Sequence, residues 1–301
     1  MKRLILIYNP YSSRFLEVKK TIFSQLKNLN DFIVDKYEIE KTNFDDNVKN
    51  VIELLKDGDF VVTAGGDATA AIAVNAILKS QKDVTLSVLP YGNFNDLSRT
   101  LGTKTLNDTL SSKKIKNFYP LEIFVDDNFY RYATCYVTIG MTAEAVKIYD
   151  YPKVRKSLKS KTGRSVGSYL ILMSWYFKNR HSKVFLPEFK LNGELKHKDT
   201  SDYAAVNGRY MARVMKGGED FLKPKVFRSE TDRLASFYRL FKLMLKSILK
   251  RIPGSDTKGD ILEFTSPATF ELQAEGEFKT FENVKKVEIK KAEQCLKVVT
   301  F

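Results

Sequence analysis

The sequence has few of the residues that build disulfide frameworks or zinc sites. Its 301 residues include two cysteines and two histidines, and Cys135 and Cys295 stand far apart without a Cys-x-x-Cys spacing. A reducing compartment such as the cytoplasm fits this composition best. His181 and His197 lie in polar, lysine-rich surroundings, and we assign them no role.

Long apolar runs are also missing. No stretch approaches the roughly twenty apolar residues that a membrane-spanning helix needs. The apolar run after Met1 is too short for a signal peptide and ends in Asn9-Pro10, so we predict a buried first strand there. A length of 301 residues allows one large domain or two ordinary ones, and a hydrophobic fraction of 43% supports sizeable cores.

Acidic residues are absent between residues 151 and 187, and the net charge of the chain is +14. Such an excess suits an anionic partner, although solubility is an alternative reason for it. Segment 234–250 combines an apolar face with a basic stripe at helical spacing. It is either a helix that lies on an anionic membrane surface or a helix that packs on its own domain. No nucleic-acid-binding motif is present, so we expect no nucleic-acid partner.

The first half of the chain is organised around two acidic turns. Segments Val61–Thr69 and Leu89–Arg99 each run from an apolar strand through small residues and a carboxylate, Asp67 or Asp96, into a helix. Glycines permit close approach of a ligand, and amides at a helix N-terminus favour phosphate. A carboxylate in such a loop needs a cation, so the pair predicts a nucleotide-phosphate and Mg²⁺ site with Asp67 in an exposed turn. For either stretch alone, a tight turn without a ligand is the alternative.

Strands and helices alternate up to about residue 120, which predicts a parallel, doubly wound α/β domain over residues 1–120. Short β-rich runs then alternate with polar turns such as Asp126-Asp127-Asn128. They predict an antiparallel, β-sandwich-like second domain over residues 121–289. The tail of about residues 290–301 is a candidate to return to the first domain.

With these residues in view, the chain resembles the diacylglycerol kinase catalytic-domain family, which includes bacterial lipid kinases and sphingosine kinases. The resemblance covers nearly the whole chain and is most specific in the second acidic turn. The segments that carry it are Asn9–Ser12, Gly65–Thr69, Leu89–Arg99, Gly140–Glu144, Asn207-Gly208, Pro224 and Glu275–Glu277.

The resemblance implies an ATP-dependent kinase that transfers the γ-phosphate to a lipid hydroxyl such as that of diacylglycerol. It implies an NAD kinase-like first domain, a site in the cleft between the domains, and peripheral attachment of a cytoplasmic protein to an anionic membrane. Glu275 would be the general base, with Glu122 as a second catalytic carboxylate. The implied Mg²⁺ ligands are Asp67, Asp96 and Asp232. The implied ATP-binding residues are Asn9, Ser12, Thr42, Gly65, Gly66, Asp67, Ala68, Thr69, Gly92, Asn93 and Asn95.

The chain departs from the family pattern at several positions. Ala68 replaces a glycine where a positive φ or a close phosphate approach is expected, and Phe94 replaces a small residue. Glu122 and Glu275 stand where the family has aspartate, and Arg233 follows an aspartate where the family has glycine.

Two other functions stay open at this level. One is a non-catalytic relative that binds nucleotide or lipid without phosphoryl transfer, marked by Ala68 and Phe94. The other is a kinase of a different hydroxyl acceptor, such as a nicotinamide nucleotide, against which the Leu89–Arg99 block argues. The sequence leaves the acceptor lipid and a homodimer undecided.

Overall fold

This computed structural model describes residues 2–140, 143, 147, 186–196, 200–211, 215–216, 225–230 and 259–301. The chain divides into two compact units, which we call unit 1 (Met1–Pro120 with Ala292–Phe301) and unit 2 (Leu121–Lys291). The predicted metal ligand Asp232, most of the basic stretch 151–187 and the amphipathic segment 234–250 lie outside the described residues.

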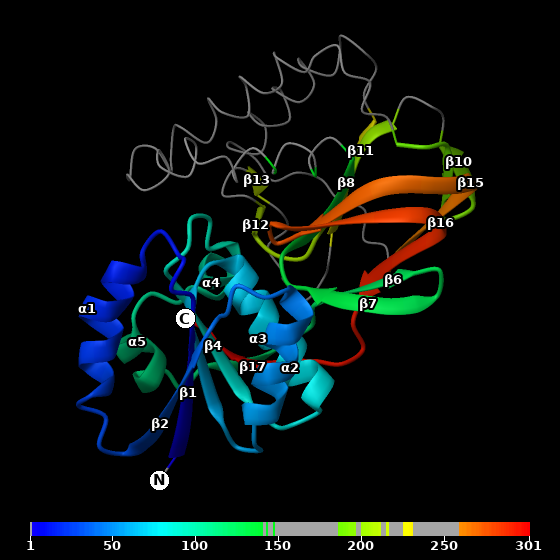
Figure 1. The fold of residues 1–301 in the computed structure, drawn as a ribbon. Helices are drawn as coiled ribbons and strands as arrows, with labels where there is room; N and C mark the ends of the chain where they lie inside the picture. Colours follow the sequence, from blue (N-terminus) through cyan, green and yellow to red (C-terminus); the bar gives the residue numbers. More distant parts are fainter. Residues whose placement is uncertain are drawn as a thin grey trace. The chain divides into compact units, whose positions relative to one another are not determined.

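Unit 1 is built on a 6-stranded sheet with helices on both faces (Figure 1). The strand order is β2-β1-β3-β4-β17-β5, and all neighbours are parallel except the antiparallel pair β17 and β5. The predicted α/β class is therefore confirmed. The elements are β1 (Lys2–Tyr8), α1 (Phe15–Leu26), β2 (Phe32–Glu38), α2 (Phe44–Leu54), β3 (Phe60–Gly65), α3 (Asp67–Ser80), β4 (Thr85–Pro90), α4 (Asp96–Leu101), α5 (Leu106–Ser111), β5 (Ile115–Phe118) and β17 (Leu296–Val299).

The burial pattern explains why these segments form this sheet. Residues 4–7 of β1 are fully buried, as expected for a strand covered on both faces. Helix α1 buries Val18, Ile22 and Leu26, which recur every four residues and form one apolar face. Figure 1 shows α1 and α5 on one face of the sheet and α2 and α3 on the other. Helix α3 is buried along most of its length, and its many alanines allow it to lie close to the strands.

The C-terminal tail supplies a strand of this sheet. β17 pairs in parallel with β4 and antiparallel with β5. After it, Thr300 N donates to Lys114 O at 2.9 Å and Phe301 N donates to Leu101 O at 3.1 Å. The last residues of the chain are thus hydrogen-bonded into unit 1.

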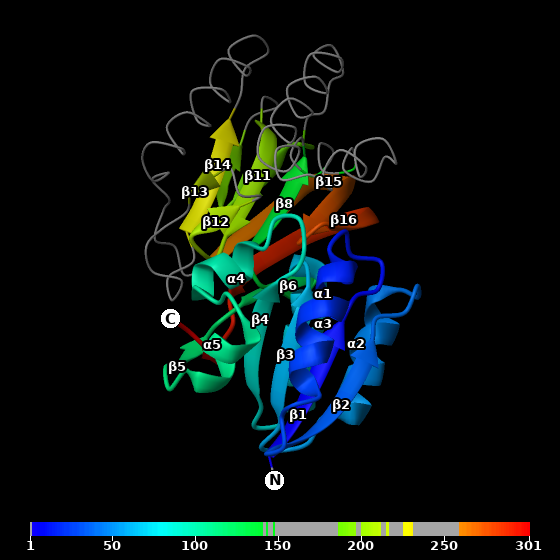
Figure 2. The same ribbon diagram turned by 90° about the vertical axis from the view of Figure 1, so that its left-hand side faces the viewer.

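The described part of unit 2 contains a 9-stranded antiparallel sheet, which confirms the predicted class of the second domain. Its main path is β14-β11-β8-β15-β16-β6-β7, with β9 joining β15 to β10, while β12 and β13 form a separate pair (Figure 2). The elements are β6 (Leu121–Val125), β7 (Asn128–Ala133), β8 (Tyr136–Gly140), β9 (Phe189–Leu191), β10 (Glu194–Lys196), β11 (Thr200–Val206), β12 (Tyr210–Met211), β13 (Met215–Lys216), β14 (Lys225–Glu230), β15 (Gly259–Ala274) and β16 (Glu277–Lys291).

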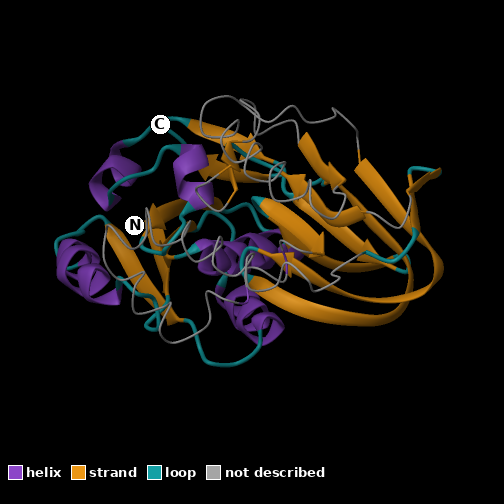
Figure 3. Ribbon diagram, turned by 90° about the horizontal axis from the view of Figure 1, so that it is seen from above, coloured by secondary structure: helices purple, strands orange, loops and turns teal. Residues whose placement is uncertain are grey.

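The long hairpin of β15 and β16 joins the two halves of this sheet. Both strands curve along their length (Figure 1, Figure 3), and their register shifts on both sides of Ala268. A shift of this kind bends a strand and increases its twist. The hairpin closes at Glu275 and Gly276, whose φ angles of +49° and +87° are typical of a two-residue type I′ turn.

Candidate active site

The two acidic turns of unit 1 form a single corner. Strands β3 and β4 are parallel neighbours, so the turns that follow them begin at the same edge of the sheet. Their backbones touch, because a Cβ added to Gly92 would lie 2.2 Å from the Gly66 Cα. We call the two segments together, residues 65–69 and 90–97, the Asp67 corner.

Glycine is required at two positions of this corner by packing within the protein. A Cβ on Gly65 would lie 2.3 Å from Thr69 Oγ1, and Thr69 is only 1% exposed. Glycine is required at position 92 for the same reason, because a Cβ there would collide with the Gly66 backbone. Gly66 and Ala68 are only half-buried, so these two residues form the accessible part of the predicted phosphate loop.

Of the two reasons given for a glycine at position 68, the positive φ is wrong, and the close approach of a phosphate stays a prediction. Ala68 is the second residue of α3, and its φ does not lie in the left-handed region. An alanine is a good residue inside a helix, so its backbone conformation needs no glycine here. The positive φ in this corner occurs instead at Asn95, with φ +57°.

Asp67 is buried, contrary to the expectation of an exposed turn. It is the first residue of α3, and its Oδ1 accepts a hydrogen bond from Leu97 N at 3.2 Å. Burial raises the pKa of the Asp67 carboxyl, while the amides at the start of α4 and the charge of Arg99 act in the opposite direction. Asp67 therefore ties the start of α3 to the start of α4, where Asp96 is also fully buried.

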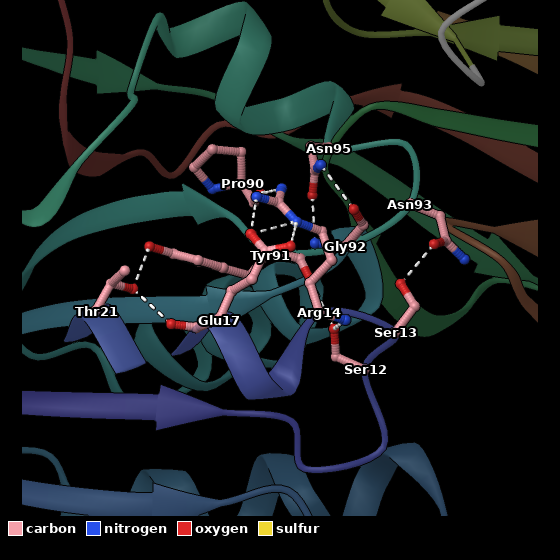
Figure 4. Close-up of polar contacts among 10 residues, drawn as sticks. All are labelled: Ser12, Ser13, Arg14, Glu17, Thr21, Pro90, Tyr91, Gly92, Asn93 and Asn95. Atoms are coloured by element: carbon pink, nitrogen blue, oxygen red, sulfur yellow. Dashed lines mark hydrogen bonds and ion pairs between the residues drawn. The ribbon is translucent and has the colours of Figure 1, made fainter. Parts of the chain in front are cut away.

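Asn95 holds the second turn closed. Its Oδ1 accepts from Gly92 N at 2.6 Å, and its Nδ2 donates to Gly92 O at 2.8 Å (Figure 4). The side chain thus binds both backbone groups of one glycine. Its observed role is to shape the turn, and any contact with a nucleotide would be additional.

The turn after β1 is attached to the Asp67 corner. Ser12 Oγ donates to Tyr91 O at 2.6 Å, and Ser13 Oγ donates to Asn93 Oδ1 at 2.7 Å (Figure 4). Two of the predicted ATP-binding residues, Ser12 and Asn93, are thereby brought to the same place. Asn9 lies at the start of this turn, and its N–H donates to the carbonyl oxygen of Ala64 in β3 at 3.5 Å.

Arg14 contacts the Asp67 corner and is not among the site residues predicted from the sequence. Its guanidinium donates to the carbonyl oxygen of Pro90, forms an ion pair with Glu17, and lies 5.2 Å from the centre of the Tyr91 ring (Figure 4). An arginine three residues before a glutamate at the start of a helix is a visible signal of the ion pair. It does not reveal the contact with Pro90.

Thr42 lies in the exposed turn after β2. Its Oγ1 accepts a hydrogen bond from Asn47 Nδ2 at 3.0 Å. Asn47 is 1% exposed and also accepts from Glu40 N at 2.9 Å, so it fixes this turn from inside helix α2. Asn47 is not among the site residues predicted from the sequence.

In unit 2, the predicted general base Glu275 is held by backbone amides. Its Oε1 accepts from the N–H groups of Thr134, Cys135 and Tyr136 at 2.7, 2.8 and 3.4 Å, and from Thr134 Oγ1 at 3.2 Å. The side chain is only 5% exposed, and burial raises its pKa to about 7 although these hydrogen bonds act in the opposite direction. A carboxyl group with such a pKa is suited to exchange a proton near neutral pH.

Gln273 also stabilises the hairpin turn at Glu275 and Gly276. With its amide oriented to satisfy its neighbours, the oxygen accepts from Gly276 N at 2.5 Å and from Glu275 N at 3.3 Å. The nitrogen then donates to Thr138 Oγ1 at 2.7 Å. We call the group formed by Glu275 and the connection Thr134–Tyr136 the Glu275 corner.

Glu122, the second predicted catalytic carboxylate, lies in β6. It is half-buried and stands opposite Tyr132 in β7 and Lys290 in β16. Burial raises the pKa of the Tyr132 hydroxyl, and the Glu122 charge adds to this effect. Tyr132 is two residues before Thr134, so β7 links Glu122 to the Glu275 corner.

The described residues contain no group of three or more His, Cys, Asp or Glu side chains close enough to hold a metal ion. Mg²⁺ is commonly held by one or two carboxylates together with water and substrate phosphates. Asp67 and Asp96, at the starts of two helices that share one corner, are a donor set that fits this chemistry. Among the same residues, we find no helix with the length and apolarity that crossing a membrane requires.

Comparison with known families agrees with this geometry. Residues 3–120 match the diacylglycerol kinase catalytic domain. The chain resembles that family. The resemblance inferred from the sequence is confirmed, and the match spans the acidic turns and every helix of unit 1.

Curated relatives include diacylglycerol kinases. The diacylglycerol kinase of Bacillus subtilis (strain 168) is 36% identical over 106 residues, which are 34% of this chain and 34% of that protein. The diacylglycerol kinase of Staphylococcus saprophyticus is 32% identical over 106 residues, 35% of this chain and 34% of that protein. The matched part covers less than half of the length of each of these relatives.

Solved structures of diacylglycerol kinases are similar to this chain in fold. A diacylglycerol kinase of Bacillus anthracis str. Sterne has a TM-score of 0.65 and 14% sequence identity, covering 100% of this chain and 97% of that chain. At this identity the likeness shows the fold alone.

Proposed function

We propose that the protein is an ATP-dependent kinase that transfers the γ-phosphate to the hydroxyl of a lipid such as diacylglycerol. The observation that carries the proposal is the Asp67 corner, where two glycine turns touch and two aspartates begin neighbouring helices. The diacylglycerol kinase match covers this corner.

Unit 1 would bind the nucleotide. The half-buried loop of Gly66 and Ala68 presents amides at the start of a 14-residue helix, where phosphate is favoured. Asp67 and Asp96 would hold Mg²⁺, which when bound neutralises phosphate charge. Asn9, Ser12, Thr42, Thr69, Gly92 and Asn93 complete the proposed nucleotide-binding set.

Unit 2 would supply the base. Glu275 would take the proton from the lipid hydroxyl as that oxygen attacks the γ-phosphate, and four hydrogen bonds to Oε1 leave Oε2 as the oxygen for this task. Glu122 stays a candidate for a second catalytic carboxylate. The basic excess of the chain supports a lipid acceptor reached at an anionic membrane surface.

The nucleotide site can be tested with a matched pair of variants. Asp67→Asn should weaken Mg-ATP binding by at least about tenfold, since loss of groups that support a metal commonly costs that much. Asp59→Asn is the control. Asp59 is also a buried aspartate and lies just before β3, whereas Asp67 lies just after it. Asp59 Oδ2 accepts a hydrogen bond from Arg3 Nη1 at 2.9 Å. The control should lose stability but keep its affinity, as measured by calorimetry and thermal unfolding.

Equal Mg-ATP affinity of the wild type and Asp67→Asn would overturn the nucleotide site. Phosphoryl transfer to the lipid is measured separately, with labelled ATP, Mg²⁺ and diacylglycerol in mixed micelles. A protein that binds Mg-ATP but labels no lipid in a panel of lipid hydroxyl acceptors would be the non-catalytic relative instead.

A further inference from the structure

The start of β8 is held from both sides by residues far away in the sequence. Strands β11 and β15 both run antiparallel to β8 and are its two neighbours in the sheet. Their C-terminal ends therefore lie beside the N-terminal end of β8. The first residues after these two strands, Asn207 and Glu275, both reach the connection between β7 and β8.

These two residues bind opposite sides of the same peptide groups. Asn207 Nδ2 donates to Thr134 O at 3.2 Å, while Glu275 Oε1 accepts from Cys135 N at 2.8 Å. That carbonyl and that N–H belong to one peptide group, which is planar. In the next peptide group, Asn207 N donates to Cys135 O at 2.6 Å, and Glu275 Oε1 accepts from Tyr136 N at 3.4 Å. Neither peptide plane can rotate without disturbing both partners.

We propose that Asn207 is a positioning residue for Glu275: it fixes the peptide planes whose amides hold Oε1, so that Oε2 is presented to the acceptor hydroxyl. The inference rests on the proposed function of Glu275 as the general base. Asn207 is fully buried, so water does not replace its hydrogen bond when the side-chain amide is removed.

The surroundings of Glu275 make its orientation sensitive to these planes. The groups bonded to its carboxylate are three amides and one hydroxyl, all of them neutral. Each of these hydrogen bonds favours the charged form and offsets part of the burial that raises its pKa. A peptide group that turns away would both release Oε1 and leave the carboxylate less stabilised.

The test uses Asn207→Ala in the full chain, with Asn192→Ala as the matched control. Asn192 lies in the same unit, and its Nδ2 donates to the buried Asp260 at 2.7 Å. It also has a φ of +52°, which alanine adopts only with strain, so the control should lose at least as much stability. Asn207→Asp keeps the size of the side chain but removes the donor.

We expect kcat for lipid phosphorylation to fall about ten- to a hundredfold in Asn207→Ala and in Asn207→Asp, as for a misplaced catalytic group. The KM for Mg-ATP should not change, and Asn192→Ala should keep the wild-type kcat. An equal loss of kcat in Asn192→Ala would show that Asn207 acts only through stability and would overturn the proposal.

A second readout does not depend on kinase activity. The Glu275 carboxyl is titrated by carbon-13 NMR, with its signal assigned by comparison with Glu275→Gln. Its pKa should rise in Asn207→Ala and stay unchanged in Asn192→Ala. An unchanged pKa in both variants would overturn the positioning role. A wild type that phosphorylates no lipid would instead remove the proposed function, while the titration still decides whether Asn207 positions Glu275.

Discussion

The Asp67 corner of unit 1 and the Glu275 corner of unit 2 each contain a buried carboxylate, but the groups around the two carboxylates differ. In each, a buried carboxylate accepts backbone N–H groups from a segment distant in the sequence, and burial raises its pKa. The amides around Asp67 begin helix α4, and the positive charge of Arg99 favours the ionised form. The groups bonded to Glu275 are neutral, and its pKa reaches about 7.

This difference separates two chemical roles. A metal ligand must stay ionised, and a nearby cation helps it to do so. A general base must release and take a proton near the working pH, which a pKa of about 7 allows. The pKa of both carboxyls is raised, so the proposed division of labour between Asp67 and Glu275 rests on their neighbours, a cation near Asp67 and neutral groups around Glu275.

The largest effect is expected from Glu275→Gln. Glutamine can still accept the amide hydrogen bonds but cannot take a proton at neutral pH. The rate of lipid phosphorylation should fall about a hundred- to ten-thousandfold, the usual cost of losing a general base. The affinity for Mg-ATP should stay the same, which distinguishes this variant from Asp67→Asn. A Glu275→Gln protein that keeps more than about a tenth of the rate would remove Glu275 from the chemistry.

The second prediction concerns stability and pH. Below the ordinary pKa of 4.5, the Glu275 carboxyl is protonated in both the folded and the unfolded chain. Between 4.5 and about 7, the unfolded chain loses this proton while the folded chain keeps it, so the free energy of unfolding falls as the pH rises. From pH 4.5 to 7, the wild type should lose about 3 kcal/mol relative to Glu275→Gln.

Urea unfolding of both proteins at several pH values measures this difference. The comparison with Glu275→Gln cancels the other titrating groups, including Asp67, whose raised pKa contributes in the same direction. A constant difference between the two proteins across this range would mean that the carboxyl of the folded protein has an ordinary pKa.

A smaller effect is expected at the backbone contact that closes the Asp67 corner. Gly92→Ala should lower the free energy of unfolding by about 2 kcal/mol, since its Cβ would lie 2.2 Å from the Gly66 Cα and the backbone must shift. Gly66→Ala is the control, because its Cβ would have an ordinary 3.4 Å contact with the Gly92 Cα. Equal losses of stability in the two variants would show that the turns do not depend on this contact.

Much of the fold could be predicted from local patterns. Apolar residues recur at helical spacing over residues 15–29, and α1 covers Phe15–Leu26. The β-rich runs 261–264 and 269–274 belong to one strand, β15, because its register shifts interrupt the pattern without ending the pairing. Strand β17 has only four residues, and its place between β4 and β5 has no signature in its own sequence.

The candidate site likewise contains some residues that local patterns predict and others that they do not. Gly65, Gly66 and Asp67 could be recognised because a strand, a small-residue turn and a helix follow one another within a few residues. Arg14 and Thr134 were missed because their partners lie far along the chain. The Thr134 amide bonds to a carboxylate 141 positions away, and no local pattern reports such a pairing.

Local sequence was sufficient for the class of each domain and for the acidic turns, because periodicity and turn chemistry depend on neighbouring residues. It could not show that Asp67 is buried, that Gly92 is fixed by Gly66, or that Glu275 lies among three amides. Those properties depend on how distant segments pack. Burial and hydrogen bonding of the folded chain then set the pKa of each carboxylate, and with it the chemistry we propose for it.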